Sequence, residues 1–284
     1  MTTTHRLIVA TILALVAVLS SGCERAFFGY VNRNLPPPDA SVEFALERSL
    51  SLDVYRPRGN VGAAPTVVFF YGGAWKRGAR EQYQFVGHRL AENGVLAIVA
   101  DYRTWPRADF PAFMDDAADA VAWARTNAGE YGGDPHRLFL AGHSAGAQIA
   151  GLLGTDRRYL SARGIEPAQL AGVIGLSGPY DFNVGSKYAA IFGSPSRWPQ
   201  AQVVNFVDGD EPPFLLVHGS EDRVVEVRDS IQLAERLRTA QVPATLVLLP
   251  DAGHSAPLTG FYAPKKAPTV LPAILDFIAT APSS

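Results

Sequence analysis

The chain has 284 residues, of which 48% are hydrophobic and 18% are charged, so it can bury a full core and fits one α/β-sized domain. Its formal net charge is −2, and it has no Lys/Arg stripe with interleaved aromatic residues. This composition argues against nucleic acid as a partner.

The first 22 residues predict a signal peptide. The uncharged run over 7–22 is too short and too abruptly ended for a membrane span, and it resembles a signal-peptide core. The run closes on L-S-S-G-C, which resembles a bacterial lipobox with Ser20 where leucine is commoner, and Cys23 is the only cysteine. We therefore expect export to the periplasm or cell surface, with lipidation of Cys23 anchoring the chain to a membrane. The alternative is an unlipidated signal peptide cleaved nearby.

Residues 23–40 are predicted to form a tether. Within them, the stretch 25–38 ends in three prolines (36–38), which predicts a stiff, extended spacer. The folded domain is expected over 41–284. Its first two segments, 42–46 and 50–55, alternate apolar and polar residues and predict two antiparallel strands at a sheet edge.

Buried-type apolar runs then alternate with segments of helical spacing. Further strands are expected at 66–71, 95–100, 138–140, 170–176, 213–217 and 244–249. Helices are expected at 82–93, 114–127, 227–240 and 269–281, with another directly after Ser144. The alternation predicts an α/β protein with a mostly parallel sheet of about eight strands covered on both faces. Residues 180–209 follow no clean period and predict a cap-like insertion over the site.

The most informative stretch is G-H-S-A-G at residues 142–146, between an apolar run and a helix of small residues. A strand, sharp turn and helix around such a pentapeptide expose the serine hydroxyl above the sheet. A serine needs a histidine base, and the base needs an acid that fixes its tautomer. Asp222 and His254 each lie just past a predicted strand, at the sheet edge where functional groups gather. Ser144, Asp222 and His254 are therefore the predicted catalytic residues.

Acyl transfer also needs N–H donors where negative charge develops on the carbonyl oxygen. The loop Y-G-G-A-W at residues 71–75 follows a buried strand. We expect the amides of Gly73, Ala74 and Ala145 to form this oxyanion hole. No metal-ligand spacing, dinucleotide fingerprint or P-loop occurs, so no metal or other cofactor is expected.

Four motifs follow one another along the chain in this order: Y-G-G-A-W, G-H-S-A-G, H-G-S-E-D and D-A-G-H. On these motifs, the region from about residue 41 to 281 resembles the α/β-hydrolase esterases. That group holds hormone-sensitive-lipase-like carboxylesterases, isoprenylcysteine methylesterase and carbohydrate esterases. Residues 130–137 and 176–182 resemble the methylesterase and carbohydrate-esterase branch. The resemblance implies the α/β-hydrolase fold and the roles given above. Family members usually have histidine where this chain has Tyr71, whose hydroxyl can still hold the loop.

The expected function is therefore hydrolysis of carboxylic esters, with small acyl or aryl esters favoured. Substrate contacts are expected from Trp75, Tyr180 and Phe182, and from the insertion that contains Tyr188 and Trp198. An arylformamidase-like or peptidase amide hydrolase would use the same triad, and a catalytically silent binding module is a further alternative. The natural substrate and the oligomeric state stay open.

Overall fold

The computed structural model describes residues 25–59 and 62–281. The chain divides between Pro36 and Pro37 into two units, and each is described by itself. The predicted signal peptide at 1–22 and Cys23 lie outside the described residues. Within the part that is described, no helix combines the length and the apolar character needed to cross a membrane.

In the first unit, residues 25–32 form a helix, so the prediction of an extended spacer is wrong for this segment. The segment contains no proline, which leaves every backbone N–H available for helical hydrogen bonds. Residues 35–38, which include the three prolines, have no regular structure.

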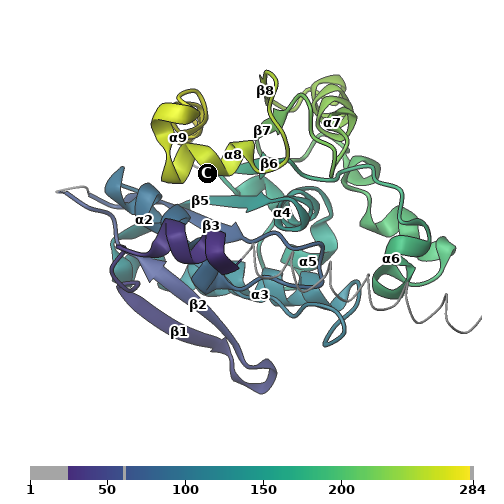
Figure 1. Cartoon of the computed structure of the whole chain (residues 1–284). Coiled ribbons are helices and arrows are strands. Elements are labelled where there is room, and N and C mark those ends of the chain that lie inside the picture. Colours follow the sequence, from purple (N-terminus) through teal and green to yellow (C-terminus); the bar gives the residue numbers. More distant parts are fainter. Residues whose placement is uncertain (1–24, 60–61, 282–284) are drawn as a thin grey trace, which may run out of the picture. The chain divides into compact units, whose positions relative to one another are not determined.

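The second unit is built on one mixed sheet whose eight described strands follow the order β1-β2-β4-β3-β5-β6-β7-β8 (Figure 1). The strands are β1 (Ala40–Ala45), β2 (Leu50–Tyr55), β3 (Ala64–Phe70), β4 (Leu96–Ala100), β5 (Gly133–His143), β6 (Gly172–Leu176), β7 (Phe214–Gly219) and β8 (Ala244–Leu249). Strand β2 runs antiparallel to both β1 and β4, and the other neighbouring pairs are parallel. The predicted sheet of about eight strands with an antiparallel edge is confirmed.

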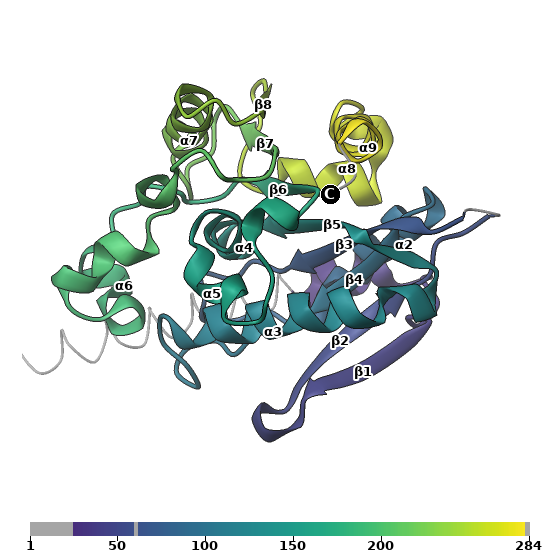
Figure 2. The same ribbon diagram turned by 180° about the vertical axis from the view of Figure 1, so that it is seen from behind.

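Helices cover both faces of this sheet (Figure 2). They are α2 (Gln84–Glu92), α3 (Ala112–Asn127), α4 (Ala145–Thr155), α5 (Arg157–Ser161), α7 (Val227–Thr239), α8 (Ala256–Tyr262) and α9 (Val270–Thr280). Helix α8 contacts α2 and α9, whereas α3 contacts α4 and α5, and these two groups lie on opposite faces. Every residue of β4 and β6 is buried as a result, which explains why their sequences are apolar without alternation.

The insertion is more regular than its sequence indicates. It contains helix α6 (Gly185–Phe192) and 3₁₀ helices at Pro195–Ala201 and Val203–Phe206. Helices α5 and α8 were also not predicted. Each of these three α-helices has eight residues or fewer, which is too short for an amphipathic period to show in the sequence.

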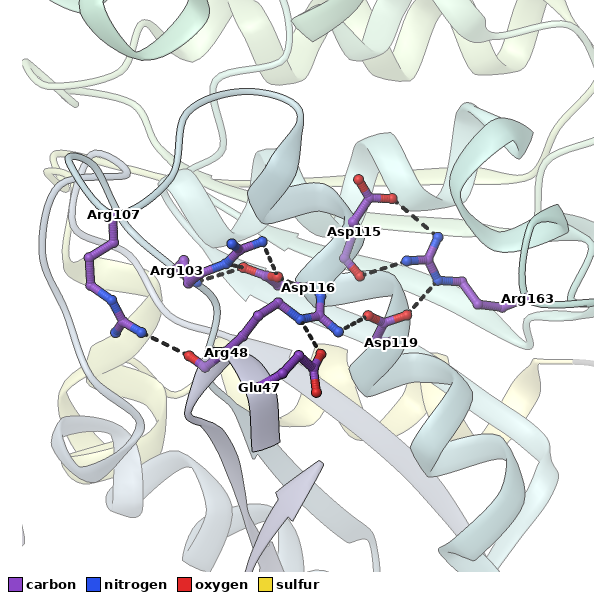
Figure 3. A network of polar contacts seen from close by, with 8 residues as sticks. All are labelled: Glu47, Arg48, Arg103, Arg107, Asp115, Asp116, Asp119 and Arg163. Carbon is purple, nitrogen blue, oxygen red and sulfur yellow. Dashed lines mark hydrogen bonds and ion pairs between the residues drawn. The ribbon is translucent and has the colours of Figure 1, made fainter. Parts of the chain in front are cut away.

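A network of partly buried ion pairs fixes the turn between β1 and β2 against helix α3 (Figure 3). The fully buried Asp116 carboxylate accepts hydrogen bonds of 2.8 Å from both Arg48 and Arg103. Next to it, Asp119 accepts from Arg48 and from Arg163, the latter at 2.7 Å. The antiparallel edge of the sheet is thereby held to the helical layer.

Candidate active site

Ser144 occupies a strained turn between β5 and α4. Its backbone has φ 55° and ψ −121°, a conformation that side-chain-bearing residues rarely adopt. The flanking glycines make the turn possible, because a Cβ on Gly146 would lie 2.0 Å from the Phe70 carbonyl oxygen and one on Gly142 would lie 2.2 Å from that of Gly146. The G-x-S-x-G motif therefore forms the expected strand–turn–helix.

The structure brings Ser144, His254 and Asp222 together. The Ser144 hydroxyl oxygen lies 2.9 Å from His254 Nε2, and His254 Nδ1 lies 2.7 Å from Asp222 Oδ2. Because a carboxylate only accepts, Nδ1 carries the proton and Nε2 is free to accept from the serine hydroxyl. Asp222 follows β7 and His254 follows β8, so adjacent parallel strands deliver both residues to the same edge of the sheet.

The Asp222 carboxylate is kept ionised by the groups around it. Its Oδ1 accepts from the backbone N–H groups of Val224 and Val225 at 2.8 and 3.0 Å, and His218 Nε2 lies 3.1 Å from its Oδ2. Burial raises the pKa of this carboxyl, but the hydrogen bonds from His218, His254 and the Val225 N–H outweigh burial and hold the pKa well below its usual range.

His143, inside the elbow, supports the His254 loop. Its Nε2 lies 3.1 Å from the His254 carbonyl oxygen and therefore donates to it, and the two rings lie 4.9 Å apart. Burial, together with the smaller effect of the nearby His254 ring, lowers the pKa of His143 to about 3, so the side chain is neutral. Neither His143 nor His218 was assigned a role from the sequence. Their one signal there is their position at the ends of β5 and β7.

The loop after β3 presents backbone N–H groups beside the serine. Gly73, Ala74 and Trp75 all have positive φ values, of 133°, 54° and 57°. A Cβ on Gly73 would lie 2.0 Å from the Arg77 carbonyl oxygen, so only glycine fits there. Among the described residues, no group accepts from the N–H of Gly73, Ala74 or Ala145. Ala74 and Ala145 line the same pocket as Ser144, and Gly73 directly precedes Ala74 in the loop.

Tyr71 holds the start of this loop through Tyr102. The Tyr71 hydroxyl donates to the Tyr102 carbonyl oxygen at 3.2 Å, and the Tyr102 hydroxyl donates to the Tyr71 carbonyl oxygen at 2.8 Å. The two rings are stacked, with centroids 4.6 Å apart. These contacts tie the loop to the segment after β4.

A cavity of about 200 Å³ opens at Ser144. Trp75 and Phe182 line it with their rings stacked at 5.2 Å between centroids, and Tyr188 from α6 lines it with its ring edge-on to Trp75 at 5.4 Å. The Trp75 indole N–H donates to Gln148 Oε1 at 3.1 Å, which fixes the ring. The rest of the lining is mixed: Pro179, Val224 and Val225 are apolar, and the polar residues are Asp181, Asn183, Lys187, Glu226, Arg228 and Asp229.

The prediction for Tyr180 needs correction, because its side chain is fully buried in the core and does not line the cavity. Its ring fits against Gly175 and Gly178, where the absence of side chains leaves room for it. Trp198 does not line the cavity either, since its indole N–H donates to the Gly193 carbonyl oxygen within the insertion.

Chemically, this arrangement pairs a serine hydroxyl with an imidazole that can accept its proton, and it places two residues with unpaired N–H donors, Ala74 and Ala145, in the same pocket lining as Ser144. In the described ranges, 25–59 and 62–281, no three His, Cys, Asp or Glu side chains gather in a way that could hold a metal ion.

The mostly parallel sheet, its helical layers and the nucleophile elbow define the α/β-hydrolase fold. Within that fold, the BD-FAE family matches residues 52–237, which is more than half of the chain. The chain therefore belongs to the BD-FAE family.

Curated relatives carry esterase names. Esterase LipC of Mycobacterium tuberculosis is 33% identical over 226 residues, which span 72% of this chain and 56% of the relative. Isoprenylcysteine alpha-carbonyl methylesterase ICME of Arabidopsis thaliana is 31% identical over 227 residues, spanning 72% of this chain and 53% of the relative. The chain thus covers about half the length of these relatives.

Solved structures share the fold. An acetyl ester-xyloside bifunctional hydrolase from Caldicellulosiruptor lactoaceticus superposes with a TM-score of 0.73 at 23% identity, over 88% of this chain and 100% of that one. A truncated carbohydrate esterase from gut microbiota gives a TM-score of 0.71 at 24% identity, over 84% and 94% of the two chains.

Proposed function

We propose that this chain is a serine hydrolase that cleaves carboxylic esters through an acyl-enzyme on Ser144. The observation that carries the proposal is the continuous set of hydrogen bonds from Ser144 through His254 to Asp222, at the mouth of a cavity. The esterase names of the relatives and the membership of the BD-FAE family support the same reaction class.

In the first half-reaction, the Ser144 oxygen attacks the ester carbonyl carbon while His254 Nε2 takes the hydroxyl proton. The carbonyl oxygen becomes an oxyanion and accepts hydrogen bonds from the N–H groups of Ala145, Gly73 and Ala74. The bond to the alcohol oxygen then breaks, and His254 gives its proton to the departing alcohol. The acyl group stays on Ser144.

In the second half-reaction, His254 takes a proton from water as the water oxygen attacks the acyl carbon. The bond to the Ser144 oxygen breaks, the serine regains the proton from His254, and the carboxylic acid leaves. Asp222 stabilises the charged imidazole in both halves and keeps the proton of the resting imidazole on Nδ1.

The cavity supports small acyl or aryl esters as substrates. Its volume of about 200 Å³ is below the usual range for drug-sized ligands, about 300–1,000 Å³. The stacked Trp75 and Phe182 rings offer a flat apolar wall that suits a planar group or a short acyl chain. We propose Trp75, Phe182 and Tyr188 as the substrate contacts.

The proposal is tested by measuring hydrolysis of p-nitrophenyl esters of increasing acyl length, together with a matched anilide, by the wild type and by Ser144→Ala. We expect turnover that is highest for short acyl groups and is lost in the variant. Preferential cleavage of the anilide would instead assign the amide-hydrolase alternative. Binding of esters without turnover above the variant would indicate a silent binding module.

We also propose that residues 1–22 direct export and that Cys23 carries a lipid anchor. The uncharged run that ends at the single cysteine supports this proposal. Mass spectrometry of the mature N-terminus tests it: an acylated Cys23 is expected, and Cys23→Ala should release the protein from membranes. An unmodified N-terminus elsewhere would contradict the anchor.

A further inference from the structure

A second histidine contacts the carboxylate that orients His254. His218 is the fifth residue of β7, and its side chain is fully buried. Its Nε2 lies 3.1 Å from Asp222 Oδ2, the same oxygen that His254 Nδ1 contacts at 2.7 Å. On the other side of the ring, Nδ1 lies 2.7 Å from the hydroxyl oxygen of Ser230 in α7.

The partners of His218 determine its tautomer. Nε2 faces two acceptors, the Asp222 carboxylate and the Val225 carbonyl oxygen at 3.3 Å, so it carries the proton. With the proton on Nε2, the Nδ1 atom of a neutral ring accepts from the Ser230 hydroxyl. Ser230 is itself fully buried, so this hydrogen bond is shielded from water.

The shared oxygen links His218 to the triad. Asp222 Oδ1 is held by the backbone N–H groups of Val224 and Val225, which leaves Oδ2 to be fixed by the imidazoles. In the proposed turnover His254 exchanges protons with Ser144, whereas His218 is fully buried, contacts Ser230 of α7 and does not line the cavity. His218 is therefore the donor on Oδ2 that takes no part in the proton transfers.

We propose that His218, held as the Nε2–H tautomer by its two acceptors and anchored through Nδ1 by Ser230, is a positioning residue that holds Asp222 Oδ2 in line with His254. This inference rests on the proposed ester hydrolysis at Ser144. Without His218, the carboxylate keeps its two backbone donors on Oδ1, but Oδ2 keeps only the donor from His254, the group that it has to orient. The His254 ring would then be oriented less accurately towards Ser144. Protonated His254 would also contact a carboxylate that accepts one hydrogen bond fewer and therefore attracts the imidazolium proton more strongly.

The test compares His218→Leu, which removes both ring nitrogens, with His218→Gln, whose amide can place an N–H near the former Nε2. A fluorophosphonate probe that labels Ser144 directly measures how well the triad activates the serine, independently of ester preference. We expect the labelling rate and kcat of His218→Leu to fall about 10- to 100-fold, the range for losing one hydrogen bond to a charged group, with KM nearly unchanged. His218→Gln should recover part of the rate.

The pH profile of kcat/KM separates positioning from a merely structural role. Besides Asp222 and His254, the titratable groups of the packed elements near this cluster include His143, whose ring packs on His254, and the buried Asp229, which precedes Ser230 in α7. When Asp222 loses the donor from His218, its charge holds the catalytic proton more strongly, so the acid limb should move to higher pH in His218→Leu. A structural defect would lower activity equally at every pH.

Ser230→Ala covers the case in which His218→Leu does not fold. It removes only the hydroxyl that anchors the His218 ring at Nδ1, and we expect a several-fold loss of labelling rate with the same direction of shift in the acid limb. Labelling at the wild-type rate in folded Ser230→Ala and folded His218→Leu would overturn the inference and leave the proposed function intact. A wild type that the probe does not label would overturn the proposed function, and the inference with it.

Discussion

At the residue scale, the site depends on one carboxylate that accepts from four donors. Asp222 receives two backbone N–H groups on Oδ1 and two imidazoles on Oδ2, and its side chain is fully buried. A buried charge of this kind is stable only when its hydrogen bonds are satisfied. The same donors that keep it ionised also fix its direction towards His254.

We therefore expect Asp222→Asn to keep its fold and lose most of its activity. The asparagine amide can donate to His254 Nδ1, which would put the histidine proton on Nε2, where it cannot accept from Ser144. A loss in kcat of about 10³- to 10⁴-fold is expected, measured beside circular dichroism and melting temperature. Activity within tenfold of the wild type would show that Asp222 does not set the tautomer.

A second buried carboxylate predicts a pH dependence of stability. Asp229 is 2% exposed, and burial raises the pKa of its carboxyl to about 6, although its Oδ2 accepts from the Tyr180 and Asp181 N–H groups. Between its ordinary value of 3.8 and about 6, the folded chain holds a proton that the unfolded chain has released. Ionisation of Asp229 therefore lowers the free energy of unfolding as pH rises through this window.

Asp229→Asn keeps an acceptor oxygen without the charge. The stability of this variant relative to the wild type should increase as pH rises from 3.8 to about 6 and then level off. Denaturant unfolding across this range measures the difference, with the exposed Asp210→Asn as control. A difference that does not change with pH would contradict the account.

At the element scale, the elbow is where β5, α4 and the end of β3 approach most closely. The missing side chains of Gly142 and Gly146 let these backbones meet, and Ser144 projects from the turn that results. The loop after β3 arrives from the neighbouring strand, so the nucleophile and the N–H donors come from adjacent parallel strands. A short sequence motif can specify such a site because the sheet supplies the rest of the geometry.

The ion-pair network of Figure 3 gives a prediction about the antiparallel edge. Asp116→Ala removes a fully buried carboxylate and leaves Arg103 without its carboxylate partner, whereas Arg48 keeps Asp119 and Glu47. We expect a loss of about 2–3 kcal/mol in the free energy of unfolding, discounted from the usual cost because both arginines are partly exposed.

Asp115→Ala is the matched control on the same helix. The Asp115 side chain is 48% exposed and forms an ion pair with Arg163, so a loss below about 1 kcal/mol is expected. Urea denaturation of both variants makes the comparison. Equal losses would show that the buried network does not hold the edge.

Most elements were predictable from the sequence because buried parallel strands are apolar throughout and longer helices show their period. Strand β8 was predicted with its observed bounds, and β2 likewise. Helices α5, α6 and α8 were not, since one or two turns give no period to read. The helix over 25–32 was not predicted, because the three prolines that follow it favour an extended chain.

At the scale of the whole molecule, the strand order explains why the triad residues could be predicted and the pocket could not. Parallel strands β5, β7 and β8 end at one edge, so residues that follow them must meet there. The burial of Tyr180 depends instead on the space left by Gly175 and Gly178, and the local hydrophobic pattern of the sequence does not predict that space. His218 lies four residues before Asp222, a spacing that acquires meaning only once the fold turns its ring onto the carboxylate.

The most direct test of the account is to stop the enzyme during turnover of a short-chain p-nitrophenyl ester and map the added mass by peptide mass spectrometry. The account predicts the mass of the acyl group on the peptide that contains Ser144, and none in Ser144→Ala. Turnover with the acyl group on another residue, or with no covalent acyl group while hydrolysis persists in Ser144→Ala, would contradict it.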